Sequence, residues 1–222
     1  GVGLLVLILT YLIRPQSPVA SNPDAAKKKK QNPALRDLLT SLRNRRTLPI
    51  FAIMFFNMIF MAAFFGFMPV LLSQKGLDPI GAGMVLALNA VVYLAVQPFS
   101  GRLSDSLGRR RVIAFGLILS TLSISLMPFL GSPLYILAAC FLAFGIGCVA
   151  PLGEALVGDA SEEETLALNL GLAGSYKELG EMAGPISVGF IGQTLGLSYA
   201  FLMVGVVGIG SLVCLGFLKE KR

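Results

Sequence analysis

Long apolar segments separated by short polar ones dominate the chain after residue 47. Six of them, at 48–73, 79–100, 112–130, 132–153, 167–192 and 197–218, are long enough to cross a membrane as helices, which takes about 20 mostly apolar residues. A shorter apolar segment, 1–13, has no basic residue before it, so we expect the end of another membrane helix rather than a signal peptide. The pattern predicts an all-α membrane protein that is part of a longer chain.

Composition supports a membrane protein and disfavours an enzyme. Hydrophobic residues make up 55% of the chain and charged ones 14%, and a soluble protein of this size cannot cover that much apolar side chain. There is no histidine, the commonest metal ligand and neutral-pH base. Cys140, Cys148 and Cys214 lie in apolar segments without metal-site or disulfide spacing. We therefore expect no enzyme, metal or cofactor.

Residues 14–47 form a polar, proline-containing, basic segment between the apolar end 1–13 and the predicted bundle 48–218. Its second part, 33–46, predicts a short amphipathic helix on the membrane surface. The lysine run 27–30 is typical of a solvated linker attracted to anionic lipid, so nucleic acid is not an expected partner.

The basic residues predict the orientation in the bilayer. Of 18 Lys and Arg residues, 16 lie in the linker, in the segment 101–111 or in the tail 219–222. Positively charged segments stay cytoplasmic, so these three parts are expected on the cytoplasmic side of a plasma membrane. Six crossings between the linker and the tail agree with this.

The segment 101–111 reads GRLSDSLGRRR. It resembles the cytoplasmic signature of the major facilitator superfamily, G-x-L-x-D-[RK]-x-G-R-[RK], except that Ser106 stands where a basic residue is usual. The resemblance implies a cytoplasmic gate, with Asp105 and Arg109 as a latch and Gly101 allowing two helix ends to approach closely. The matching positions are Gly101, Leu103, Asp105, Gly108, Arg109 and Arg110.

The same resemblance implies a fold of twelve helices in two six-helix halves. The partial helix and basic linker ahead of the first complete segment favour the C-terminal half over the N-terminal one, and 137–151 lacks the arginine that many N-terminal halves carry. We expect a six-transmembrane-helix half of a twelve-helix major facilitator fold, whose partner is the missing N-terminal six-helix half.

Three charged residues, Lys177, Glu178 and Glu181, interrupt the fifth complete segment near its middle. Charges at that depth cost about 2.5–3.5 kcal/mol each unless they are paired or hydrated. Lys177 and Glu181 are four residues apart and can pair on one helix face. We expect the cluster to couple transport to a proton or to bind solute, with Glu178 as the proton carrier; a purely structural ion pair is the alternative.

The fifth segment also carries a pattern of small residues that resembles the antiporter signature G-x8-G-x3-G-P-x2-G-G. In the superfamily this signature marks proton-linked drug exporters when it lies in helix five, and the present segment is the pseudo-symmetric helix eleven. Ordinary close packing of helices explains the same residues. They are Gly171, Gly180, Gly184, Pro185 and Gly189.

The resemblance also implies a central cavity, and two other segments supply candidate residues for its lining. The first complete segment has Asn57, Phe60 and Phe64 at helical spacing, and an aromatic surface facing lipid would account for most of the same residues. The second has a polar stripe, Asn89, Tyr93 and Gln97, which either contacts the other half or knits helices together.

These features predict a secondary transporter that works by alternating access. An aromatic and methionine-rich wall with one polar anchor favours a small lipophilic or cationic solute, and the expected process is proton-coupled efflux, with the bilayer and that solute as partners. A metabolite importer or facilitator of the same superfamily, and a membrane scaffold or receptor on the same fold, are the alternatives.

Overall fold

The computed structural model describes residues 41, 44 and 46–218, all within one compact unit, 36–222. The apolar end 1–13, most of the linker and the tail 219–222 lie outside the described residues, as does nearly all of the amphipathic helix expected at 33–46. The helices are α4 (Leu48–Gln74), α5 (Pro79–Leu107), α6 (Arg109–Leu126), the short 3₁₀ helix η1 (Met127–Phe129), α7 (Leu134–Ala160), α8 (Leu166–Leu195) and α9 (Leu197–Gly216).

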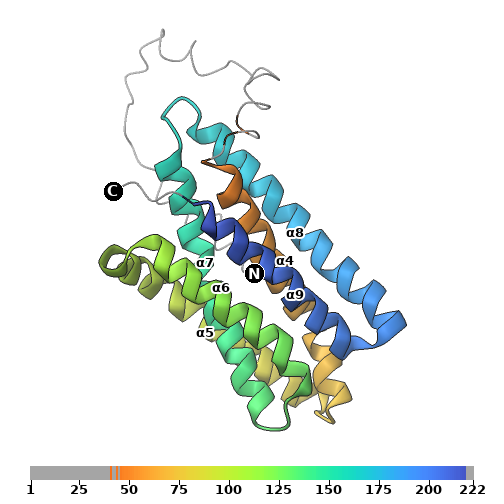
Figure 1. Cartoon of the computed structure of the whole chain (residues 1–222). Coiled ribbons are helices and arrows are strands. Elements are labelled where there is room, and N and C mark those ends of the chain that lie inside the picture. The colour runs from red at the N-terminus through yellow and green to blue at the C-terminus, as the bar shows by residue number, and fades with distance from the viewer. Residues whose placement is uncertain (1–40, 42–43, 45, 219–222) are drawn as a thin grey trace, which may run out of the picture. The chain divides into compact units, whose positions relative to one another are not determined.

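Successive helices run antiparallel, which gives the bundle two ends (Figure 1). We call one of them the basic end, because it carries Arg46, Arg102 and Arg109–Arg111. Helices α4, α6 and α8 begin there, and α5, α7 and α9 end there.

Local sequence explains several helix boundaries. Asp78 caps α5, because its Oδ1 accepts a hydrogen bond of 3.1 Å from the Gly81 amide, and Pro79 follows as the first helical residue. At the junctions α5–α6 and α8–α9 the chain turns at Gly108 and Gly196, whose φ angles are +90° and +93°. Only glycine adopts such angles without strain.

The motif segment 101–111 falls between the predicted crossings 79–100 and 112–130, which implied a connecting loop, but the structure shows that it is helical except at Gly108. Helix α5 continues to Leu107, and only Gly108 separates it from α6. No glycine or proline follows Gly101 until Gly108, and the hydroxyls of Ser104 and Ser106 donate to carbonyls three residues earlier in the same helix. Among the described residues none lies within 4 Å of a Cβ atom placed on Gly101, so it does not serve a close approach between these helices.

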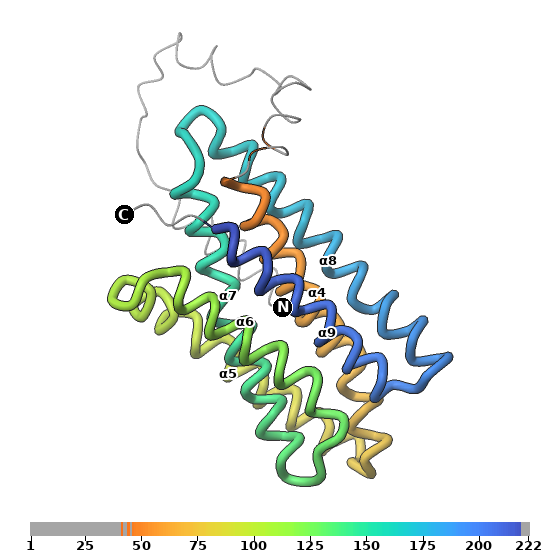
Figure 2. Tube along the Cα trace, viewed as in Figure 1, coloured from red at the N-terminus to blue at the C-terminus, as the bar shows by residue number. Residues whose placement is uncertain are grey.

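Helix α4 lies at the centre of the bundle, in contact with α7, α8 and α9, while α7 also packs against α5 and α6 (Figures 1 and 2). Its aromatic side chains fill the interior, where Phe51, Phe60 and Phe64 are completely enclosed. Helices α5 and α8 are far less covered: only 6 of 29 and 5 of 30 of their residues are buried, compared with 13 of 27 in α7.

Five of the described helices, α4, α5, α6, α7 and α9, are long and apolar enough to cross a membrane; α6 is here counted together with η1. The sixth expected crossing, α8, is a helix of 30 residues. It falls outside this group because Lys177, Glu178 and Glu181 lie in its middle. An all-helical arrangement of six long helices is therefore present, with one of them unusually polar.

Candidate functional site

An ion pair joins two helices at an open surface of the bundle. The Nζ atom of Lys177 on α8 lies 2.8 Å from Oε1 of Glu154 on α7. Both side chains are partly accessible, at 34% and 57% exposure. A salt bridge of this kind ties α7 to α8 at a surface that the rest of the bundle leaves open.

The depth of this ion pair follows from helix geometry. Glu154 comes six residues before the end of α7 and Lys177 eleven residues after the start of α8. At 1.5 Å per residue these positions are roughly 9 Å and 16 Å from the basic end along their helices. Both charges therefore lie within their helices and not in the turn that connects them.

Tyr93 of α5 stands beside the ion pair. The Tyr93 hydroxyl lies close enough to Lys177 and Glu154 for their charges to act on it. Gln97, one turn along α5, lies beside the same hydroxyl. Gly147 of α7 makes this arrangement possible, because a Cβ atom there would come within 2.8 Å of the Tyr93 carbonyl. Thus α5, α7 and α8 each bring one member of the group Tyr93, Glu154 and Lys177.

The predicted pairing of Lys177 with Glu181 is not the one found. Glu178 and Glu181 are exposed on α8, and within the described residues neither takes part in an ion pair. Sequence reasoning missed Glu154 because it placed the end of the fourth segment at 153, whereas α7 continues to Ala160. With the longer helix, Glu154 would have stood out as an ionisable residue inside a membrane helix.

The residues expected to line a cavity are divided between the interior and the surface of the bundle. Phe60 and Phe64 are fully enclosed in the apolar core, and Asn57 and Asn89 are 4% and 0% exposed. Asn57 donates to the Ile146 carbonyl at 3.5 Å and Asn89 to the Val85 carbonyl at 2.6 Å, while both side-chain oxygens have no partner among the described residues. Of this set, only Tyr93 and Gln97 are partly accessible.

Small residues of α8 lie where this helix crosses α4. A Cβ atom on Gly180 would clash with the Phe55 carbonyl oxygen, and one on Gly184 would come within 2.8 Å of the Ile59 carbonyl oxygen. Gly171 has open space, Gly189 is in ordinary contact with Phe67, and Pro185 lies inside the continuous helix. Close packing thus needs two of the glycines in this pattern.

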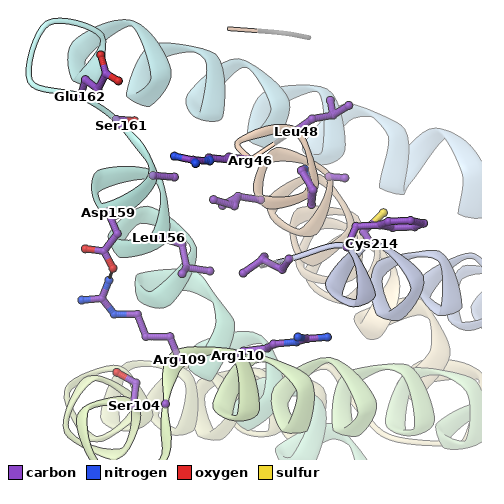
Figure 3. Close-up of a pocket in the computed structure, with 17 residues that line it drawn as sticks. Arg46, Leu48, Ser104, Arg109, Arg110, Leu156, Asp159, Ser161, Glu162 and Cys214 are labelled. Carbon is purple, nitrogen blue, oxygen red and sulfur yellow. Dashed lines mark ion pairs between the residues drawn. The ribbon is translucent and has the colours of Figure 1, made fainter. Parts of the chain in front are cut away.

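The motif arginine Arg109 forms an ion pair with Asp159, near the end of α7 (Figure 3). Its Nη1 also donates to the Ala155 carbonyl at 3.3 Å. The predicted partner was Asp105, which is exposed and forms no ion pair within the described residues. The pair therefore connects α6 to α7 instead of closing the motif on itself.

Within the residues that the structure describes, no three His, Cys, Asp or Glu side chains gather in a way that could hold a metal ion. The charged group of α7 and α8 instead combines a lysine with a carboxylate, a pair that can exchange a proton or hold a charged solute.

Comparison with known proteins agrees with the architecture. Residues 50–222 match the family model described as Major Facilitator Superfamily. The tetracycline resistance protein of class E from Escherichia coli is 30% identical over 184 residues, covering 81% of this chain and 45% of that protein. The quinolone resistance protein NorA of Staphylococcus aureus is 30% identical over 144 residues, covering 64% and 37%. The chain thus spans less than half the length of these relatives.

Among solved structures, a peptide transporter crystallised with sulfate superimposes with a TM-score of 0.71 at 18% identity, covering 77% of this chain and 37% of that one. This likeness concerns the fold. With the six-helix arrangement, the motif ahead of α6 and a family match over most of its length, the chain belongs to the major facilitator superfamily.

Proposed function

We propose that the chain is the C-terminal six-helix half of a secondary transporter that exports a small lipophilic or cationic solute in exchange for protons. Two relatives named for resistance to tetracycline and to quinolones, and the share of their length that the chain spans, support this assignment. The uncovered faces of α5 and α8 are the surfaces that we expect to meet the N-terminal half, and the two halves would rock around the site between them.

The observation that supports proton coupling is the ion pair between Glu154 and Lys177. A proton on Glu154 would cancel its charge and remove the attraction to Lys177, so α7 and α8 would be held together in one protonation state and released in the other. Such a pair is the bistable element that a proton-driven conformational change needs.

Glu178 and Glu181 add two carboxylates to the same stretch of α8. With Glu154 they outnumber Lys177, so the open surface around the pair is negative when all four groups are charged. A negative surface attracts cations, which favours a cationic solute. We propose Glu178 and Glu181 as contributors to solute binding or to proton relay, with Glu154 as the group paired directly to Lys177.

We also propose that the basic end faces the cytoplasm of a plasma membrane. Arg102 and Arg109–Arg111 lie there, at the junction of α5 and α6, and Lys75 is the one basic residue of the described chain at the opposite end. The positive-inside rule assigns the basic end to the cytoplasm.

The test is transport by the complete transporter that contains these residues, reconstituted in liposomes with an imposed pH gradient and ethidium as the probe cation. Glu154→Gln should lower proton-driven ethidium transport at least about tenfold, the size of effect expected when an essential proton-transfer group is lost. Glu163→Gln, in the exposed turn between α7 and α8, is the matched control and should transport normally.

Ethidium counterflow without a pH gradient separates loss of coupling from loss of folding, because a folded but uncoupled Glu154→Gln variant still exchanges the probe. Full proton-driven transport by this variant contradicts the proposal. Gradient-independent transport by the unmodified protein would instead indicate a facilitator.

A further inference from the structure

A second candidate site lies at the basic end, away from the Lys177–Glu154 pair. A hollow of about 1310 Å³ opens between the first turns of α4 and α6 and the last turns of α7 and α9 (Figure 3). This exceeds the roughly 300–1,000 Å³ of ordinary small-molecule pockets. A free inorganic anion would fill only a small part of it.

Two arginines supply positive charge to the hollow. Arg46 reaches it from the residues just before α4, and Arg110 from the first turn of α6. Arg110 uses one nitrogen, Nη2, to donate to the Gly216 carbonyl at 3.5 Å, and a guanidinium has five N–H donors in all. Within residues 46–218 neither arginine forms an ion pair with a carboxylate.

The acidic residues of the hollow leave that charge largely uncompensated. Asp159 is already paired with Arg109, so these two cancel each other. Glu162 is exposed in the turn between α7 and α8. The remaining charged groups, Arg46 and Arg110 against Glu162, make the hollow net positive.

Most of the wall between the arginines is apolar. Leu156 and Ala160 come from α7, and further apolar side chains come from the start of α4 and the end of α9: Leu48, Pro49, Ile50, Ala52, Cys214, Phe217 and Leu218. Such a lining repels a fully hydrated anion but accepts the glycerol and upper acyl region of a lipid. The hollow therefore combines an anion-binding rim with an apolar interior.

We propose that this hollow binds one anionic phospholipid of the leaflet at the basic end, with its head group toward the arginines that line the hollow, Arg46 and Arg110, and its acyl portion against Leu156 and its apolar neighbours. Arginine suits this task because its planar guanidinium binds phosphate oxygens in a bidentate manner. A bound lipid here would bridge the ends of α4, α6, α7 and α9. The proposal does not depend on the transport function.

The experiment counts lipids retained by the full chain, purified in detergent and mixed with dioleoyl phosphatidylglycerol or dioleoyl phosphatidylcholine, using native mass spectrometry. One phosphatidylglycerol should remain bound where phosphatidylcholine is lost. Arg46→Gln and Arg110→Gln should each weaken retention about fivefold, the effect of one basic residue near an anionic lipid. Arg110→Lys, which keeps the charge, should weaken it less than Arg110→Gln.

The matched control is Arg111→Gln, because Arg111 is exposed next to Arg110 but does not line the hollow. An equal loss of lipid in this variant would show attraction to overall charge and would overturn the proposal. Displacement of phosphatidylglycerol by millimolar inorganic phosphate would also overturn it, since the occupant would then be the anion alone. A monodisperse elution profile for each variant excludes misfolding as the cause.

Discussion

Helices α5 and α7 lie side by side and are both apolar, yet they occupy different environments. In α7, 13 of 27 residues are buried, many of them glycine and alanine, whereas α5 buries 6 of 29 and exposes large side chains such as Ile80, Met84 and Phe99. Lipid tails are as apolar as leucine, so hydrophobicity does not decide which membrane helix lies inside. Close contact between backbones does, and small residues permit it.

The strongest test of this difference compares two phenylalanines. Phe60 is fully buried, whereas Phe190 on the open face of α8 is 73% exposed. We expect Phe60→Ala to destabilise the bundle by about 3 kcal/mol or more, because it leaves a cavity in the core. Phe190→Ala, tested in the six-helix chain without an N-terminal half to cover it, should change stability by less than about 0.5 kcal/mol. Thermal unfolding in detergent measures both, and equal effects would refute the division into covered and open faces.

A smaller effect is expected where backbones touch. A Cβ atom on Gly145 of α7 would lie 2.6 Å from the Gly116 carbonyl oxygen of α6, while Gly83 of α5 has open space. Gly145→Ala should therefore cost about 1–3 kcal/mol through overpacking. Gly83→Ala should be neutral or slightly stabilising, since alanine favours the helix by about 1 kcal/mol. Unfolding midpoints of the two variants decide the matter.

The smallest expected change in stability concerns Asn89, the fully buried amide side chain of α5. Asn89 is 0% exposed, and its Oδ1 has no partner among the described residues. Asn89→Leu removes an unsatisfied group and should leave stability unchanged or raise it by about 1 kcal/mol. A clear loss of stability would mean that Oδ1 does have a partner, such as a buried water molecule, and transport by the same variant shows whether that partner matters for function.

Much of the fold could be predicted from the sequence. The six apolar segments, the all-helical class and the motif 101–111 led to the superfamily that the comparisons confirm, and membership in a transporter family agrees with the expectation that the chain is not an enzyme. Helix ends were less accurate. Gly108 and Gly196 end helices as their φ angles require, but the ends of α5 and α7 lie seven residues beyond the predicted ones.

These misplaced ends explain much of what was missed at the candidate site. Glu154 and Asp159 were expected at or beyond the end of a helix, and both prove to be helical residues with basic partners on other helices. Lys177 and Glu154 are 23 residues apart in the sequence. Arg109, at the start of α6, is paired with Asp159, near the end of the next long helix, α7. A local pattern such as the i,i+4 spacing of Lys177 and Glu181 gives no information about such contacts.

The sequence by itself determined that this protein crosses a membrane, where most of its helices begin, which end is basic and which superfamily it belongs to, because these properties depend on local hydrophobicity, glycine and charge. Only the tertiary structure decided which faces are covered, which carboxylate meets Lys177, and that a hollow forms beside Arg46 and Arg110. These depend on how closely the helices approach, and that is set by side-chain shape across helices that are distant in sequence.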